Sequence, residues 1–396
     1  MPYYRELFDA AGLRPDDIRS VTDIGRIPIT TRETIQRRPV AEIVASGYDQ
    51  QRLVVRRTSG SSGEWLAIRR TPAEELLLSA FRWRALYRVG VRPWHRVAIV
   101  GLVSTENAPA VRIVSRALTT LGLFRKTTVD CRQEPARLAE ALRDLRPDVV
   151  LGLPGAISSA ATEMRAGGGL RLRGRLVVTG GEVVTPLMRR QIAQGFGARV
   201  ADVYGSHEFR TIAWECRETG EYHTSDDTLI VEVVKDGRSA APGERGDLVA
   251  TNLHARAMPF LRFRLADAVV QGTSGCPCGA PFGTIREIHG RSVDYFPLPD
   301  GRLLHPYELS MNIPDRWPWV RRYQLVQERR DLIRMRIEAY NPPPSDREIA
   351  DVRAVAADLL GPDVAFEVEM VERLGADANG KFRVSLTLVP RQDGER

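Results

Sequence analysis

Residues 58–63 of the chain read Thr-Ser-Gly-Ser-Ser-Gly, a run of glycine and hydroxyl side chains. Glycine permits backbone turns that direct several N–H groups towards one anion, and the hydroxyl groups add further donors. The apolar residues on either side, at 53–55 and 65–68, indicate strands. The familiar nucleotide loop opens a helix and ends in Gly-Lys-Ser/Thr, whereas no lysine follows here. The run therefore predicts an anion-binding loop between two strands, with a flexible surface turn as the alternative.

A second set of residues could bind a metal ion. Cys216 and His223 lie on a predicted β-hairpin, and Cys276 and Cys278 follow in a glycine-rich segment. Three sulfurs and one imidazole form a complete tetrahedral ligand set for a structural Zn²⁺ ion. The alternative is a group of buried thiols without metal. Cys131 stands apart from this set and is expected in the core.

Helix and strand patterns alternate along the segment from 72 to 204. This segment is therefore expected to form the framework that holds the candidate site residues. Thr71 before Pro72 marks the start of a helix over 72–90. Strands are expected at 96–102, 127–130, 148–153, 175–179 and 199–204, and helices at 107–122, 134–145, from 154 to about 167, and at 186–197. This alternation predicts a mainly parallel sheet covered by helices.

Ligands of such sheets bind beyond the carboxyl ends of the strands. Two polar clusters, Thr179–Glu182 and Tyr204–Glu208, follow strands directly. The pattern then becomes mainly β from about 227 to 271. The last hundred residues predict a smaller α+β unit with strands within 321–339, 364–371 and 382–389 and a helix over 345–360.

Composition excludes several classes of protein. The chain has 396 residues, of which 43% are hydrophobic and 27% charged, as in soluble globular enzymes of two or three domains. No apolar stretch is long enough for a membrane span or a signal peptide, so a cytoplasmic protein without a membrane partner is expected. The net charge of +7 comes from scattered arginines without a dense basic run, so no nucleic-acid partner is expected. Anionic small substrates account for the charge equally well.

Six short motifs follow one another along the chain: the loop Thr58–Gly63, Gly181-Glu182, Tyr204–Glu208, Arg264–Asp267, Gly290–Asp294 and Asn379–Arg383. In this order they resemble those of the adenylate-forming enzymes, the superfamily of acyl- and aryl-CoA ligases, and in particular its phenylacetate-CoA ligase branch. The N-terminal segments 3–13 and 27–32 are also similar to that branch, although the leading helix of the branch is not expected in this chain.

The resemblance implies an α/β fold. A large N-terminal adenylation domain, 1–294, would have mainly parallel sheets, a β subdomain and the zinc cluster. A small mobile α+β lid domain, 295–396, would follow it. Apolar side chains around 100–110, 151–160 and 203–212 would line the acyl pocket. The oligomeric state is left open, with a homodimer as one option.

The resemblance also implies a two-step reaction. A small, aromatic carboxylic acid would attack the α-phosphate of ATP, with Mg²⁺ as cofactor, to give an acyl-adenylate and pyrophosphate. Coenzyme A would then displace AMP. The alternative acceptor is an amine or a carrier-protein thiol, as in amide-forming synthetases of secondary metabolism. A zinc-containing nucleic-acid-binding protein is the less favoured reading, because it leaves the six motifs unexplained.

Roles for individual residues follow from the same resemblance. The β- and γ-phosphates would be held by Thr58, Ser59, Gly60, Ser61, Ser62 and Gly63. Tyr204 would stack on adenine, Gly181 and Glu182 would line the base pocket, and Asp267 would accept from the ribose hydroxyls. The remaining nucleotide-binding residues would be Gly205, Ser206 and Arg291.

Three residues would be catalytic. Glu208 is similar to the magnesium-binding glutamate, a hard oxygen donor suited to this cation. Lys381 is similar to the C-terminal lysine that bridges the carboxylate and the α-phosphate, a task that favours a compact ammonium. It is one of only three lysines in the chain. His207 stands where the family usually has threonine or serine. It could donate to phosphate, face the acyl pocket or be structural, and it is the one residue that favours a nucleotide-binding homologue without turnover.

Overall fold

The computed structural model describes residues 1–57, 66–102, 118–166, 168–273, 275–291, 295–313, 317–377 and 381–389. The chain forms two compact units, one of residues 1–92 and 201–288 and the other of residues 93–200 and 289–396. The predicted loop Thr58–Gly63 and most of the helix expected at 107–122 lie outside the described residues. In the described ranges, no helix has both the length and the hydrophobicity needed to cross a lipid bilayer.

The first unit begins with short helices and a hairpin. Its N-terminal elements are α1 (Pro2–Ala10), α2 (Arg32–Gln36), α3 (Val40–Ile43), β1 (Val54–Arg57) and β2 (Ala67–Arg70). β1 and β2 pair antiparallel, with Arg57 opposite Ala67, so residues 58–65 join two strands as predicted. The helix predicted at 72–90 is α4 (Pro72–Val89), and Thr71 Oγ1 caps it by accepting from the Glu74 N–H.

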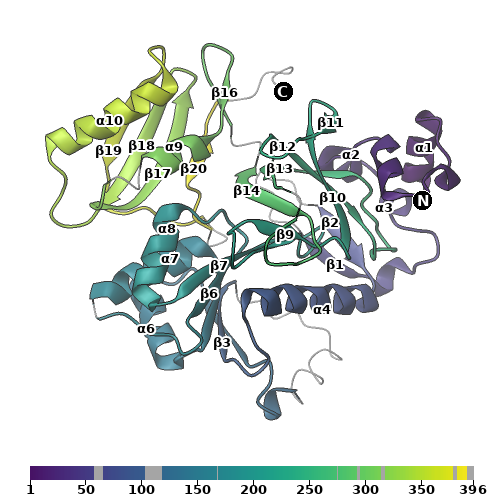
Figure 1. The fold of residues 1–396 in the computed structure, drawn as a ribbon, viewed down its shortest axis with the longest axis horizontal. Helices are drawn as coiled ribbons and strands as arrows, with labels where there is room; N and C mark the ends of the chain where they lie inside the picture. Colours follow the sequence, from purple (N-terminus) through teal and green to yellow (C-terminus); the bar gives the residue numbers. More distant parts are fainter. Residues whose placement is uncertain are drawn as a thin grey trace. The chain divides into compact units, whose positions relative to one another are not determined.

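A mainly antiparallel sheet forms the rest of the first unit (Figure 1). Its strand order is β11 (Arg238–Ser239), β10 (Leu229–Lys235), β12 (Arg245–Asn252), β13 (Phe263–Gln271), β14 (Thr284–Arg291), β9 (Tyr222–Thr224), β8 (Ala213–Glu215) and β7 (Arg199–Tyr204). Phe209, Phe260 and Phe263 are almost fully buried and pack together in its core. The β region predicted from 227 to 271 is therefore confirmed.

A parallel sheet occupies the N-terminal part of the second unit. Its strand order is β4 (Lys126–Asp130), β3 (Val97–Gly101), β5 (Val149–Gly152) and β6 (Leu176–Thr179). The helices α6 (Pro135–Leu145), α7 (Pro154–Ala166) and α8 (Pro186–Phe196) pack beside it (Figure 1). Apolar residues of this sheet and these helices share one buried core, which includes Cys131 as predicted. The alternating βα pattern is thus confirmed in the described residues.

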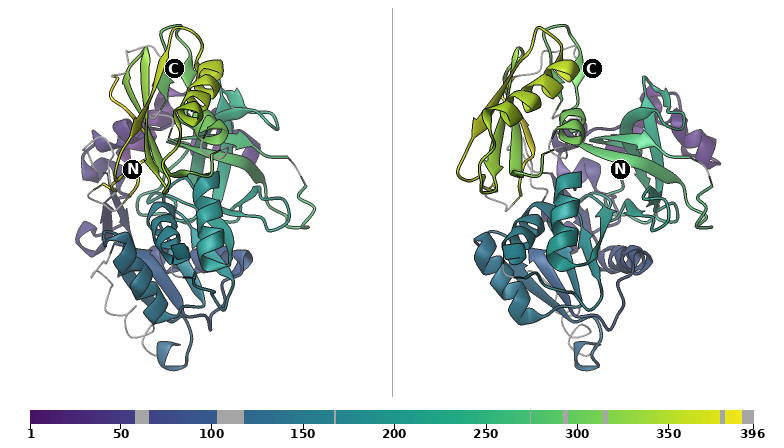
Figure 2. Two further views of the ribbon diagram at one scale, coloured as in Figure 1. Left: turned by 90° about the vertical axis from the view of Figure 1, so that its left-hand side faces the viewer. Right: turned by 60° about the vertical axis from the view of Figure 1, so that its left-hand side comes forward.

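A four-stranded sheet forms the C-terminal part of the second unit (Figure 2). Its strand order is β19 (Ala365–Met370), β18 (Leu332–Ala339), β17 (Val320–Arg329) and β20 (Ser385–Thr387). Helix α10 (Asp346–Leu360) buries Val352, Ala356 and Leu360 in the core that it shares with this sheet. The smaller elements β15 (Phe296–Pro297), β16 (Leu303–Leu304) and α9 (Pro306–Asn312) precede it. The predicted mixed α/β architecture with a small α+β C-terminal portion is confirmed.

Candidate functional site

The motif Tyr204–Glu208 begins at the last residue of β7 and continues into a tight turn. A Cβ atom at Gly205 would lie 1.9 Å from the carbonyl oxygen of Arg210, so only glycine fits there. The Ser206 hydroxyl accepts a hydrogen bond from the Phe209 N–H at 3.2 Å, which closes the turn. Gly205 and Ser206 therefore shape the backbone that presents their neighbours.

Two residues predicted to contact the nucleoside lie together in the first unit. The Tyr204 hydroxyl donates a hydrogen bond to the carboxylate of Asp267, which lies on β13. This bond fixes the orientation of both the Tyr204 ring and the Asp267 carboxylate. A ring and a carboxylate held in this way can offer a stacking face and two acceptor oxygens to a nucleoside.

Glu208 lies at the end of the same turn. Its residue is 8% exposed, and its carboxylate has no hydrogen-bond or ion-pair partner among the residues that the structure describes. The Arg70 guanidinium acts electrostatically on this carboxylate, whose oxygens can still serve as ligands of a cation. The donor chemistry therefore fits Mg²⁺. The neighbouring His207 is exposed, so core packing does not require a histidine at this position.

A buried arginine holds the backbone of both residues. The Arg70 guanidinium, 1% exposed, donates to the carbonyl oxygens of His207 at 2.7 Å and Glu208 at 2.6 Å. Its other terminal nitrogen donates to Glu75 of α4 at 3.0 Å. Burial raises the pKa of Glu75, but the guanidinium groups around it, Arg210 first, outweigh burial and hold the pKa below its usual range. Arg70 was missed by sequence reasoning because one arginine among many carries no signal.

The Gly181-Glu182 motif lies in the second unit, after β6. Gly181 has a φ of +86°, in the left-handed region that glycine adopts without strain. The Glu182 carboxylate accepts hydrogen bonds from the backbone N–H of Gly155 at 3.0 Å and of Phe382 at 2.9 Å. Burial raises the pKa of Glu182 to about 7, against these two bonds and the charges of Lys381 and Arg322.

Lys381 belongs to the segment that Glu182 holds. Its backbone N–H donates to the Asp377 carboxylate at 2.9 Å, and its carbonyl oxygen accepts from the Asp377 N–H at 2.8 Å. The next residue, Phe382, is 5% exposed and packs with Met188. The described part of the Asn379–Arg383 motif, residues 381–383, is therefore fixed next to the Gly181-Glu182 motif.

Three further predictions have no structural description. The loop of Thr58, Ser59, Gly60, Ser61, Ser62 and Gly63 lies outside the described residues, as do 103–110 of the expected acyl pocket. Arg291 ends β14, and its side chain also lies outside the described part of the chain. Their roles stay predictions.

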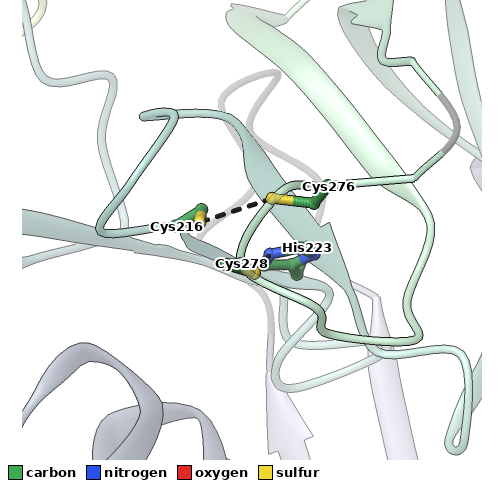
Figure 3. A group of neighbouring side chains, drawn as sticks. All are labelled: Cys216, His223, Cys276 and Cys278. Carbon is green, nitrogen blue, oxygen red and sulfur yellow. Dashed lines mark hydrogen bonds between the residues drawn. The ribbon is translucent and has the colours of Figure 1, made fainter.

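The four predicted metal ligands come together in the first unit (Figure 3). Cys216 follows β8, His223 lies on β9, and Cys276 and Cys278 lie between β13 and β14. Their ligand atoms all lie within 4.8 Å of one another. Cys216 Sγ is 3.6 Å from Cys276 Sγ, and His223 Nε2 is 3.1 Å from Cys278 Sγ. All the cysteines are free thiols, so no disulfide competes for these sulfurs.

The electrostatics of the cluster also suit a cation. Burial opposes ionisation of Cys216, but the N–H groups of Thr219 and Glu218 lower the pKa of its thiol to about 6. A backbone hydrogen bond from Ala280 lowers the pKa of Cys278, but burial and the neighbouring sulfurs together outweigh it and raise this pKa to about 11. The cluster thus accommodates one thiolate easily and resists a second. A divalent cation would remove that conflict, so the donor set fits Zn²⁺.

Comparison with known proteins gives a consistent set of relatives, although no protein-family model matches the sequence. The chain is 27% identical to phenylacetate-coenzyme A ligase of Escherichia coli K12 over 278 residues, which is 67% of this chain and 62% of that protein. It is 26% identical to the Thermus thermophilus enzyme of the same name over 358 residues, 86% of this chain and 78% of that one. The likeness to phenylacetate-CoA ligases predicted from the motifs is confirmed.

Solved structures confirm the fold. 2-Hydroxyisobutyryl-CoA ligase, in a complex with 2-HIB-AMP, superposes with a TM-score of 0.79 at 20% identity, over 98% of this chain and 85% of that one. An anthranilate CoA ligase in complex with anthranoyl-AMP gives a TM-score of 0.61 at 13% identity, over 91% and 73%. The chain therefore has the fold of acyl-CoA ligases of the adenylate-forming superfamily.

Proposed function

We propose that the chain is an AMP-forming acid–thiol ligase. In the first step, an oxygen of the carboxylic acid attacks the α-phosphorus of ATP, and the bond to pyrophosphate breaks. In the second step, the sulfur of coenzyme A attacks the acyl carbonyl carbon, and AMP leaves. The observation that carries the proposal is the placement of Lys381, whose neighbour Phe382 donates its N–H to Glu182 of the Gly181-Glu182 motif.

The residues have complementary roles in this proposal. Lys381 neutralises charge that develops between the carboxylate and the α-phosphate. Tyr204 stacks on adenine, and Asp267 accepts hydrogen bonds from the ribose. Glu208 holds Mg²⁺, which supplies positive charge to the phosphates when bound. Residues 1–294 then form the adenylation domain and 295–396 the lid that carries Lys381.

The substrate is a small aromatic carboxylic acid in this proposal, and the acceptor is coenzyme A. The names of the relatives support both choices, because they are ligases of phenylacetate and anthranilate with CoA. 2-Hydroxyisobutyryl-CoA ligase shows that the fold also serves a branched hydroxy acid. An amine or a carrier-protein thiol is the alternative acceptor.

ATP–pyrophosphate exchange across a panel of aryl, arylacetic and hydroxyalkyl acids tests the proposal. Exchange with at least one aromatic acid, and thioester formation once CoA is added, is the expected result. The absence of exchange with every acid, in protein that binds ATP, contradicts the proposed activity. Release of AMP with hydroxylamine or another amine, but not with CoA, would assign the amine acceptor.

We also propose that Cys216, His223, Cys276 and Cys278 hold one structural Zn²⁺ ion. Freshly purified protein is expected to contain about one equivalent of zinc by elemental analysis. Cys276→Ala should lose most of the metal and lower the melting temperature, because a structural metal contributes to folding. Cys131→Ala, which removes a thiol far from the cluster in sequence, should keep its zinc. Less than about half an equivalent in the unmodified protein would count against the site.

A further inference from the structure

The residue after Lys381 is buried in a slot of the second unit. Phe382 packs with Met188 and Leu374, and its ring lies beside the N-terminus of α7. We infer that Gly155, Glu182 and Arg322 are positioning residues that hold Phe382 in this slot and so fix Lys381 for the adenylate-forming step. The inference rests on the function proposed for Lys381.

Glu182 joins two segments that are far apart in sequence. One carboxylate oxygen accepts from the Gly155 N–H at 3.0 Å, at the start of α7. The other accepts from the Phe382 N–H at 2.9 Å. Both oxygens are therefore committed to backbone donors, and the carboxylate acts as a bridge between α7 and the C-terminal segment. When the carboxyl group is ionised, these bonds are charge-assisted and stronger than neutral ones.

Gly155 provides the space for the bound segment. A Cβ atom built on Gly155 would lie 2.7 Å from the Cβ of Phe382 and 3.1 Å from an oxygen of Glu182. The first distance is shorter than non-bonded carbon atoms tolerate. The backbone of Gly155 has no positive φ, so only this close approach requires glycine.

Arg322 covers the slot from β17. Its guanidinium lies over the Phe382 ring, 4.5 Å from the centroid. It donates to the carbonyl oxygens of Leu374 at 2.8 Å and Gly155 at 3.1 Å, and also to the Ser159 hydroxyl. One side chain thus contacts α7, the segment before Lys381 and the ring after it. A planar fork of donors that also stacks on a ring is specific to arginine.

The position of Lys381 follows from these contacts. Its backbone is clamped on one side by the paired hydrogen bonds with Asp377 and on the other by Phe382. With its backbone held, the positions open to the ammonium group are limited by the length of the lysine side chain. A displacement of about 1 Å at a reacting group can cost about 100-fold in rate, so the slot controls catalysis without contacting substrate.

The slot is bordered by polar and charged groups. A cavity of about 250 Å³ adjoins it, with a mainly polar lining. Across this region Arg321 pairs with Glu163, and Arg373 pairs with Glu134. Partly exposed ion pairs contribute little net stability, whereas Phe382 is the buried apolar anchor. The segment is therefore held mainly by the burial of this ring together with the contacts of Glu182 and Arg322.

Gly155→Ala tests the inference, because it fills the slot and removes no side chain. We expect the rate of ATP–pyrophosphate exchange to fall at least about 10-fold, as a change in kcat with little change in KM for ATP. Thioester formation from chemically prepared acyl-adenylate should stay within about twofold of the wild type. Hydrogen–deuterium exchange of the peptide 381–389 should become faster.

Gly375→Ala is the matched control. Gly375 lies in the same C-terminal segment, and a Cβ atom there would meet nothing within 4 Å. Gly375→Ala should leave the rates of both half-reactions and the hydrogen–deuterium exchange of the peptide 381–389 unchanged. If Gly155→Ala leaves exchange of 381–389 and the adenylation rate unchanged, or lowers both half-reactions equally, the positioning role is wrong.

Glu182→Gln keeps the side-chain shape but replaces one acceptor oxygen with an NH₂ donor, so one backbone bond is lost. It should speed hydrogen exchange of 381–389 and lower adenylation, and it serves as the test if Gly155→Ala does not fold. Unchanged hydrogen exchange in Glu182→Gln would overturn the bridge. If the wild type lacks pyrophosphate exchange with every acid, the proposed function fails, while the hydrogen-exchange comparison still tests the slot.

Discussion

Replacement of Lys381 with alanine is expected to lower ATP–pyrophosphate exchange by at least about 100-fold, the cost of removing one donor aimed at developing charge. The structure fixes the backbone of Lys381 beside Glu182 through Phe382, so the substitution removes an ammonium without disturbing its support. Thioester formation from preformed acyl-adenylate should remain, because the α-phosphate bond is already made when that step begins. The measurement is the pair of half-reactions on one preparation.

The chain offers a clean control for this experiment. Lys235, which pairs with Glu244 at 3.1 Å on the first unit, is another of the three lysines. Lys235→Ala removes the same charge and should leave both half-reactions within about twofold, as expected of a surface ion pair. Pyrophosphate exchange at the wild-type rate in Lys381→Ala would reject the catalytic role of this lysine. Equal loss in both half-reactions would reject its restriction to adenylation.

Local signals in the sequence were sufficient for most of the fold. Thr71 and Pro72 predicted the start of α4, since a capping hydroxyl and a proline suit the first turn of a helix. The alternation of apolar strands and amphipathic helices predicted the parallel sheet from β3 to β6. These signals act over a few residues, so a single sequence carries them.

The ligand set of the candidate metal site was also predictable, because cysteine and histidine are rare and their chemistry limits the alternatives. Contacts made by common residues were not. Arg322 is one of many arginines, and its place over Phe382 depends on how β17 packs against α7. The role of Gly155 likewise follows from the approach of a segment more than two hundred residues away in sequence. Such contacts are set by tertiary packing and leave no local pattern.

Arg70→Met is expected to lower the free energy of unfolding by about 3–5 kcal/mol, the usual cost of breaking a buried ion pair by removing one partner. Arg70 is 1% exposed, and its loss leaves Glu75 with one fewer cation and the carbonyl oxygens of His207 and Glu208 without their donor. Methionine fills much of the space of the arginine stem, so the change reports mainly on charge and hydrogen bonds. Urea unfolding followed by tryptophan fluorescence measures it.

The same variant should also affect the proposed magnesium site, because Arg70 holds the backbone of Glu208. The Mg²⁺ concentration at half-maximal pyrophosphate exchange should rise in Arg70→Met, since a displaced carboxylate binds the cation less well.

Arg69→Met is the control, because the neighbouring Arg69 donates only to the Ala67 carbonyl oxygen among the hydrogen bonds that the structure describes. Its unfolding free energy should change by less than about 1 kcal/mol. Equal losses of unfolding free energy in the two variants would show that the buried contacts of Arg70 add no specific stabilisation. A loss of stability in Arg70→Met without a change in Mg²⁺ dependence would separate Arg70 from the proposed site and leave it as a purely structural anchor of the turn after β7.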